Sequence, residues 1–229
     1  MSEDGLKKMI IAIDGPAGAG KSTIAKMVAD KLGLKHIDTG AMYRALALKA
    51  MREGKDCTDG KVLIDLLSRS KIEIRADNRC SPAVILLDGE DVSGEIRLPE
   101  INHKVSQVAK VPEIRRELVK LQRELAAGGG VVMDGRDIGT IVLPGADIKI
   151  YLTASLEERV RRRYHELIQR GSPTSLAETK KQVVDRDRGD RERKTGPLRM
   201  APDAFYLDTT GLTPGEITAK IVRLCDEGG

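Results

Sequence analysis

The stretch Gly15-Pro-Ala-Gly-Ala-Gly20-Lys21-Ser22 decides the fold class of this chain, because it matches the pattern G-x-x-x-x-G-K-[ST]. It follows the apolar run of Lys8–Asp14, which predicts a short buried strand. It precedes Lys21–Leu32, where apolar residues recur at helical spacing until Gly33. A glycine-rich turn at a helix N-terminus directs backbone N–H groups toward phosphate oxygens. The stretch therefore predicts a loop that binds a nucleoside triphosphate.

The residue types in this loop predict individual roles. The Lys21 ammonium would span the β- and γ-phosphates, and the Ser22 hydroxyl would bind Mg²⁺. Asp14, which ends the strand, would orient the loop or hold a metal-bound water, and Asp134 is a second candidate for that water. The remaining predicted triphosphate-binding positions are Gly15, Pro16, Ala17, Gly18, Ala19, Gly20 and Thr23.

The rest of the chain alternates between strand-like runs and helical stretches, which is typical of an α/β protein with a mostly parallel sheet. Further strands are expected at 35–38, 130–134, 147–152 and 204–208, and further helices at 41–52, 155–170 and 213–225. The segment 71–92 breaks this alternation and predicts a small antiparallel element. The segment 172–202 has few apolar residues and many charges, so we expect a mobile flap that buries little. The alternative is the solvated face of a helix.

The positive charge is concentrated in one segment. The whole chain carries +4, but Arg159–Arg199 holds ten Arg and three Lys against six acidic residues, which makes the remainder negative. Such a surplus indicates an anionic partner. With four Tyr, one Phe and no Trp, a nucleic-acid platform of stacked aromatic side chains is disfavoured.

The cysteines and the N-terminal stretch argue against a disulfide-rich secreted protein and against a membrane protein. Cys57, Cys80 and Cys225 are odd in number and widely spaced, so we expect ordinary thiols in a reducing compartment. The apolar run Met9–Ile13 is too short for a signal or membrane segment, and no later run approaches membrane length. These features favour a cytoplasmic protein with no membrane partner.

The residues after the strand that ends at Asp134 favour phosphoryl transfer over hydrolysis. Gly135-Arg136-Asp137 follows, rather than the Glu with which motor ATPases polarise water, and the Asn-Lys-x-Asp guanine signature of switch GTPases is missing from the sequence. If the acceptor is itself a phosphate, guanidinium groups must cancel the repulsion between two anions. The candidates are Arg44, Arg136, Arg186, Arg188, Arg191 and Arg193.

From about residue 8 to about residue 222, the chain resembles the bacterial cytidylate kinases, a branch of the nucleoside monophosphate kinase family. The first matching stretch, IDGPAGAGKST (Ile13–Thr23), is common to many nucleotide-binding proteins, whereas DTGAMYR, DGEDVSGEIR and DGRDIGT in this order are specific to the family. The other matching stretches are DTGAMYR (Asp38–Arg44), LDGEDVSGEIR (Leu87–Arg97), SQVAKVPEIR (Ser106–Arg115), MDGRDIGT (Met133–Thr140), RDRGDRERKTGPL (Arg186–Leu198) and LDTT (Leu207–Thr210).

The resemblance implies a single kinase unit in three parts. The P-loop core would comprise 8–40, 98–163 and 200–225, and the monophosphate-binding region would be 41–97, with the small sheet at about 71–92. A helical basic lid would span 164–199. The implied reaction transfers the γ-phosphoryl group of ATP, with Mg²⁺, to CMP or dCMP. We expect a monomer that does not bind nucleic acid.

The resemblance also implies residue roles. Ser106, Arg115 and Asp137 would read cytosine, whose amine needs an acceptor and whose N3 and O2 need donors. The acceptor phosphate would be held by Arg44 and Arg136. The other implied monophosphate-binding residues are Thr39, Tyr43, Asp134, Arg186, Asp190 and Arg193.

Arg159 and Arg163, four residues apart on one helix face, would flank the adenine and the triphosphate, by the same resemblance. Gly189 stands at a lid position where some relatives carry Arg, so the resemblance implies a different stiffness of the lid at this position. No general base is expected, because the attacking oxygen is already an anion. The implied catalytic groups are Lys21, Arg136, Arg186 and Arg193.

Two other functions compete with this interpretation. One is a kinase of the same fold for another acceptor, such as a different nucleotide or a small hydroxy acid. The other is a nucleotide-gated protein that binds nucleic acid through the basic segment, and it predicts salt-dependent affinity. The acidic residues interleaved in that segment and the scarcity of aromatic side chains argue against the second alternative.

Overall fold

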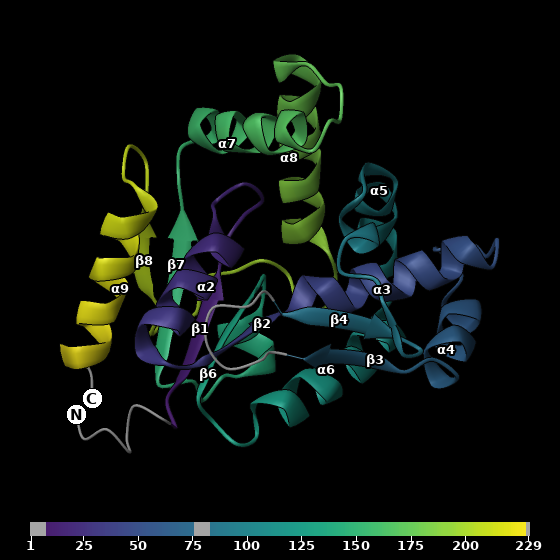
Figure 1. The fold of residues 1–229 in the computed structure, drawn as a ribbon, viewed down its shortest axis with the longest axis horizontal. Coiled ribbons are helices and arrows are strands. Elements are labelled where there is room, and N and C mark those ends of the chain that lie inside the picture. Colours follow the sequence, from purple (N-terminus) through teal and green to yellow (C-terminus); the bar gives the residue numbers. More distant parts are fainter. Residues whose placement is uncertain (1–7, 76–82, 228–229) are drawn as a thin grey trace. The chain divides into compact units, whose positions relative to one another are not determined.

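The computed structural model describes residues 8–75 and 83–227 (Figure 1). The chain divides into two compact units, the first formed by Met1–His36 with Gly128–Gly229 and the second by Ile37–Ala127. Each unit has its own cluster of buried apolar side chains. Burial of apolar surface is the main stabilising term of a fold. Because each unit buries its own apolar cluster, each is described by itself.

The first unit is built on a five-stranded sheet with the order β2-β6-β1-β7-β8. Strand β1 pairs in parallel with β6 and β7, and β7 pairs in parallel with β8. The bounds are β1 (Ile10–Asp14), β2 (Lys35–Asp38), β6 (Val131–Gly135), β7 (Ile148–Thr153) and β8 (Phe205–Asp208). This confirms the parallel α/β sheet. The register aligns Asp14 with Gly135, so the carboxyl ends of β1 and β6 lie side by side, the edge at which open α/β sheets bind ligands.

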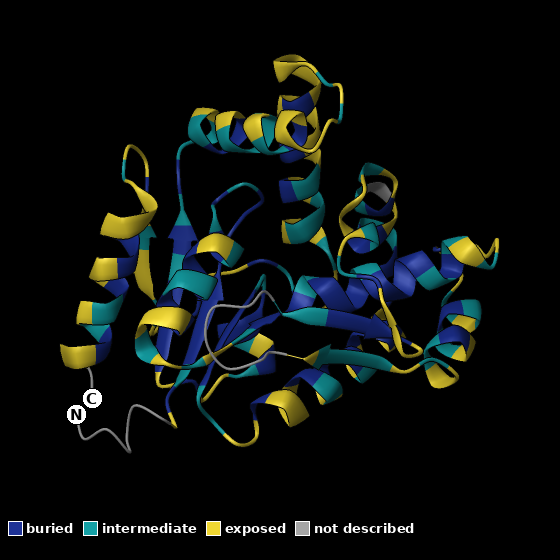
Figure 2. Ribbon diagram, in the orientation of Figure 1, coloured by how far each residue is buried: buried dark blue, intermediate teal, exposed yellow. Residues whose placement is uncertain are grey.

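Two helices cover one face of this sheet. Helix α2 (Lys21–Leu32) contributes Ile24 and Val28, and α9 (Pro214–Glu227) contributes Ile217 and Ile221, to a cluster with Ile11 and Ile13. In Figure 2 the central strands are buried, whereas the edge strand β8 is mostly exposed. The apolar spacing of α2 explains why it forms a helix with one face on the sheet. Its N-terminus lies near the end of β1 because only a short loop connects them.

The basic segment forms two helices, α7 (Leu156–Gln169) and α8 (Leu176–Glu192), which pack against each other. The predicted flap is therefore helical, and a capping box between Ser175 and Glu178 starts α8. The expectation that this segment buries little is wrong for one face, because Thr179, Val183 and Asp187 are buried. They recur every four residues, but two of the three are polar, so hydropathy alone does not reveal the stripe.

The second unit packs around α3 (Thr39–Arg52). The predicted antiparallel element is confirmed as a three-stranded sheet of the order β3-β4-β5, although residues 76–82 within the predicted segment lie outside the described ranges. The remaining elements are α4 (Gly60–Ser68), β3 (Ile72–Arg75), β4 (Val84–Leu87), β5 (Glu90–Asp91), a 3₁₀ turn η1 (Glu95–Arg97), α5 (Pro99–Val108) and α6 (Pro112–Ala126). Residues 98–127, which we expected in the P-loop core, lie in this unit because Ile101, Ile114 and Leu118 join the apolar cluster around α3.

Two of the three cysteines can be described. Cys57 and Cys225 are buried free thiols, and burial raises the pKa of both, to about 11 for Cys225. A raised pKa keeps a thiol protonated and unreactive. Cys80 lies outside the described residues. Within the described ranges, the structure contains no helix with the length and apolarity needed to cross a membrane.

Candidate active site

The phosphate loop joins β1 to α2 and lies directly against β7 and α7. Gly15 has φ +153°, and a Cβ at this position would clash with the carbonyl oxygen of Leu152. Gly18 has φ +74°, and its Cβ would lie 2.6 Å from the carbonyl oxygen of Arg159. Both positions therefore require glycine, for backbone conformation and for space. The predicted strand–loop–helix arrangement is confirmed in detail.

Lys21 is a buried cation at the first position of α2. The residue is 6% exposed, and Nζ donates a hydrogen bond of 2.8 Å to the carbonyl oxygen of Pro16 in the same loop. Burial lowers the pKa of Lys21 well below its usual value, and the charges of Arg136 and Arg186 lower it further. An anion bound at the loop would offset both effects, so the site is electrostatically prepared for phosphate.

Asp14 organises the turn that follows β6. Its two carboxylate oxygens accept hydrogen bonds from the backbone N–H groups of Ile138, at 2.8 Å, and Gly139, at 2.7 Å. These residues begin η2 (Ile138–Val142), a single π-helical turn directly after Asp137. Burial raises the pKa of Asp14 to about 6, although the two backbone hydrogen bonds oppose the shift. Asp14 therefore orients η2.

We expect the stability difference between wild type and Asp14→Asn to change with pH. Burial raises the native pKa above the unfolded value of about 3.9, so stability from this group is complete below that value and is lost as pH rises through about 6. Between about pH 5 and about pH 8, the wild type should lose about 1 kcal/mol of unfolding free energy relative to the variant. Urea unfolding at several pH values measures this change. A difference that is constant with pH would contradict the shifted pKa.

Asp134 accepts a hydrogen bond from Ser22 and also contacts a third residue, His36. Ser22 Oγ donates to Asp134 Oδ2 at 2.7 Å, and Nε2 of His36 lies 2.7 Å from Asp134 Oδ1. Asp134 points to the α2 face of the sheet because Val132, two residues earlier, belongs to the cluster beneath α2. Ser22 and Asp134 are both sequence-predicted site residues, whereas His36 is not. A lone His in a strand carries no motif that could have revealed it.

Three predicted arginines converge around Asp190 on α8. Arg136 Nε donates to Asp190 Oδ2 at 2.7 Å, and Arg193 Nη1 lies 3.5 Å from Asp190 Oδ1. Burial raises the pKa of Asp190, but Arg136, Arg186 and Arg193 outweigh it and hold the pKa below its usual value. Arg193 also lies 3.4 Å from Asp137. The first unit thus brings a cluster of three arginines close enough to Lys21 for Arg136 and Arg186 to shift its pKa.

Arg159 lies beneath the phosphate loop. It is buried and donates to the carbonyl oxygens of Ala154, at 3.1 Å, and Ala17, at 2.9 Å, and to Asp187 at 2.6 Å. Asp187, on α8, also accepts a hydrogen bond of 3.0 Å from the backbone N–H of Ala17. These contacts tie α7 and α8 to the loop, whereas the expected contact of Arg159 with adenine stays a prediction. Asp187 was not among the predicted site residues.

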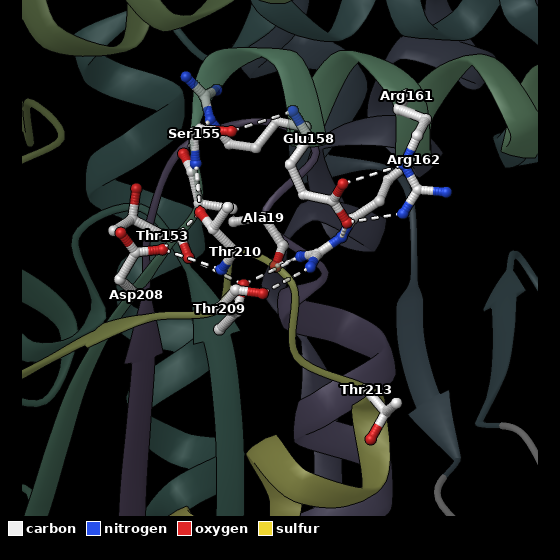
Figure 3. A network of polar contacts seen from close by, with 12 residues as sticks. Ala19, Thr153, Ser155, Glu158, Arg161, Arg162, Asp208, Thr209, Thr210 and Thr213 are labelled. Atoms are coloured by element: carbon white, nitrogen blue, oxygen red, sulfur yellow. Dashed lines mark hydrogen bonds and ion pairs between the residues drawn. The ribbon is translucent and has the colours of Figure 1, made fainter.

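A second arginine, Arg162, joins the loop to the segment after β8, and it is not among the predicted site residues (Figure 3). Its Nη1 donates to the carbonyl oxygen of Ala19 at 3.3 Å and to Thr209 Oγ1 at 2.9 Å. Its Nη2 donates to the carbonyl oxygen of Thr209 at 2.8 Å, while Glu158 accepts from Nε. Arg163 instead pairs with Glu166 at 2.7 Å. Because three arginines follow one another at 161–163, the sequence does not show which of them contacts the loop.

The second unit holds the other predicted monophosphate-binding residues. Arg44 pairs with Asp38 at 2.6 Å, and the Arg115 guanidinium lies over the Tyr43 ring at 5.6 Å from its centroid. Arg97, which was not nominated, lies 4.0 Å from Asp38 and so faces the same carboxylate as Arg44. Thr39, at the start of α3, is buried, and Ser106 on α5 is half-buried. Each unit thus contains a group of the predicted site residues.

The family model for cytidylate kinase matches residues 11–227, which include the phosphate loop and the arginine cluster. The chain belongs to the cytidylate kinase family. It is 51% identical to the cytidylate kinase of Geobacillus thermodenitrificans (strain NG80-2), over 96% of this chain and 98% of that protein. It is 48% identical to that of Symbiobacterium thermophilum (strain DSM 24528 / JCM 14929 / IAM 14863 / T), over 97% and 98%. As a member of this family, the chain is a kinase.

The crystal structure of an uncharacterized protein from Eubacterium ventriosum ATCC 27560 resembles this kinase with a TM-score of 0.54 and 13% identity. The match covers 96% of this chain and 99% of that chain. At this identity the likeness supports the fold alone, which agrees with the sheet order described above.

Proposed function

We propose that this kinase transfers the γ-phosphoryl group of ATP to CMP or dCMP, giving ADP and CDP or dCDP. The observation that carries the proposal is the cluster of Arg136, Arg186 and Arg193 around Asp190, within electrostatic reach of Lys21. Transfer between two phosphates requires such preorganised positive charge, because it must offset the repulsion between the anions. The cytidylate kinases that are about half identical in sequence support the choice of acceptor.

The proposed reaction is a direct displacement. A phosphate oxygen of the monophosphate attacks the γ-phosphorus, and the bond from that phosphorus to the β–γ bridging oxygen breaks, leaving ADP. Lys21 stabilises the negative charge that grows on the leaving group. Arg136, Arg186 and Arg193 align and neutralise the acceptor and the transferred group. We propose that 164–199 acts as a lid whose closure excludes water, which suppresses hydrolysis of ATP.

The residues at the start of α2 fit a magnesium ion bound with the nucleotide. Ser22 offers a hydroxyl oxygen, and Asp134 Oδ2 is held 2.7 Å from it. Mg²⁺ prefers oxygen ligands, keeps several waters and takes the rest of its shell from substrate phosphates. Ser22 would hold the ion directly, and Asp134 would hold one of its waters. When bound, the ion supplies further neutralisation of phosphate charge.

The acceptor phosphate would be bound by arginines that surround one carboxylate. Asp38 holds Arg44, whose buried Nε has no hydrogen-bond partner among the described residues, so one N–H is left for a phosphate oxygen. Arg97, near the same carboxylate, is proposed as a second phosphate ligand. For the base, we propose Asp137 as acceptor from the cytosine amine, with Arg115 and Ser106 as donors to N3 and O2.

We expect Asp137→Ala to raise the KM for CMP by about 30-fold and to erode the preference for CMP over UMP. Without Asp137 the cytosine amine loses its acceptor, whereas uracil, which carries an oxygen there, loses nothing. Steady-state kinetics with both acceptors measure the effect, and Asp30→Ala, at an exposed position on α2, is the matched control. Unchanged discrimination in Asp137→Ala would assign base reading to another residue.

The proposed function is tested by steady-state kinetics with ATP and CMP, dCMP, UMP, AMP or GMP. We expect CMP and dCMP to have the highest kcat/KM. Turnover of UMP or AMP equal to or better than that of CMP would overturn the cytidylate assignment and favour another acceptor. Turnover of a small hydroxy acid with none of the monophosphates would overturn the phosphate acceptor altogether.

A further inference from the structure

A third side chain stands behind the pair that would hold the magnesium nucleotide. His36 lies on β2, next to β6 in the sheet, and its Nε2 lies 2.7 Å from Oδ1 of Asp134. The other oxygen of the same carboxylate accepts from Ser22. The carboxyl side chain is 3% exposed and the His36 side chain 16%, so water has little access to the contact.

The chemistry of the three groups fixes the direction of both hydrogen bonds. A carboxylate only accepts, so Nε2 of His36 must carry the proton and the Ser22 hydroxyl must donate its own. A serine hydroxyl has one hydrogen and two lone pairs. With the hydrogen directed to Asp134, the lone pairs of Ser22 point away from the carboxylate and are available to a cation.

His36 contributes to how Asp134 holds the hydroxyl. The carboxylate rotates about two side-chain torsions, and the hydrogen bond from Ser22 restrains one of its oxygens. The hydrogen bond from His36 restrains the other, so the plane of the carboxylate is fixed from both sides. Groups that orient a metal ligand from behind in this manner commonly change metal affinity by about tenfold or more when removed.

We propose that His36 is a positioning residue for the donor nucleotide: through Asp134 it orients the Ser22 hydroxyl toward the magnesium ion. This inference rests on the proposed function, because it assumes that the donor binds as its magnesium complex. It does not depend on which acceptor is phosphorylated. His36 touches neither the nucleotide nor the reacting atoms in this proposal.

The test is the affinity for ADP, measured by calorimetry once with excess Mg²⁺ and once in EDTA. We expect His36→Phe to weaken binding about tenfold with Mg²⁺ and by less than about twofold in EDTA. His36→Gln, which can place an amide N–H near Asp134, should recover most of the loss. Lys31→Met, at an exposed position in the last turn of α2, is the control and should match wild type in both conditions.

Equal losses with Mg²⁺ and in EDTA would overturn the proposal and reduce His36 to a structural residue. A second comparison distinguishes this role from poor folding of the variant. In a Ser22→Ala background, His36→Phe should have almost no further effect on magnesium-dependent affinity, because the effects of coupled residues do not add. An undiminished effect there would also overturn it. Because ADP binding requires no acceptor, these outcomes are independent of whether CMP is the substrate.

Discussion

Replacement of Lys21 by methionine should lower kcat about 1,000-fold while the KM for CMP stays within about twofold of wild type. Methionine retains the aliphatic length of the side chain but removes the ammonium, which is buried and donates a hydrogen bond to the carbonyl oxygen of Pro16. The loss falls on kcat because charge on the donor phosphates grows as the bond to the leaving group breaks. Steady-state kinetics with saturating CMP measures it.

Lys31→Met is the control for this variant, because Lys31 lies in the last turn of the same helix and is exposed. It removes an equal charge far from the loop and should leave kcat unchanged. A fall in kcat of less than about tenfold in Lys21→Met would contradict the assigned role, provided that the melting temperature shows a folded variant. Removal of the buried ammonium also relieves a desolvation cost, so we do not expect Lys21→Met to be less stable than wild type.

Replacement of Arg136 by methionine should also lower kcat about 1,000-fold, and Arg136→Lys should recover no more than about tenfold of that loss. The guanidinium uses Nε for Asp190 and one bond of 3.2 Å to the carbonyl oxygen of Gly135. Its remaining N–H groups form the planar fork that matches two phosphate oxygens. A lysine keeps the charge but lacks this fork, so alignment of the transferred group is lost.

The effect of Arg136 substitutions is measured by kcat with CMP and by calorimetric affinity for CMP. We expect affinity for CMP to fall as well, because Arg136 holds the acceptor phosphate in the proposed function. Arg161→Met, on the exposed side of α7, serves as control and should retain full activity. Full recovery by Arg136→Lys would show that only the charge matters and would contradict the requirement for paired hydrogen bonds.

Sequence patterning predicted the elements whose chemistry is local. The start of α2, the position of β1 and the antiparallel sheet were all expected, because each depends on apolar spacing and turn residues within one short stretch. Helices α4, α5 and α6 were not assigned. The boundary of the second unit was also not expected, because it depends on which apolar faces meet: α6 packs with α3 and α4, which are distant in sequence.

The site shows the same division. The roles of Lys21 and Ser22 follow from the loop motif itself, since the spacing of glycines and the following helix determine where both side chains lie. The contacts of Asp187, Arg162 and His36 could not be predicted in this way. Each depends on a partner more than 90 residues away or on a neighbouring element, such as Ala17 for Asp187 and Asp134 for His36. A hydrogen bond needs a particular distance and direction, which sequence spacing does not encode across elements.

The sequence by itself therefore determined a triphosphate-binding loop, a parallel α/β sheet and the family, because short-range patterns carry all three. It also located the basic surplus in 159–199. Only the tertiary structure decided how those charges are used. Within this segment, Arg159 and Arg162 donate hydrogen bonds to the phosphate loop. Arg186 and Arg193 instead lie around Asp190, together with Arg136 from outside the segment. The physical reason is that burial and the choice of partner, rather than residue type, determine whether an arginine supports a structure or remains available to a phosphate.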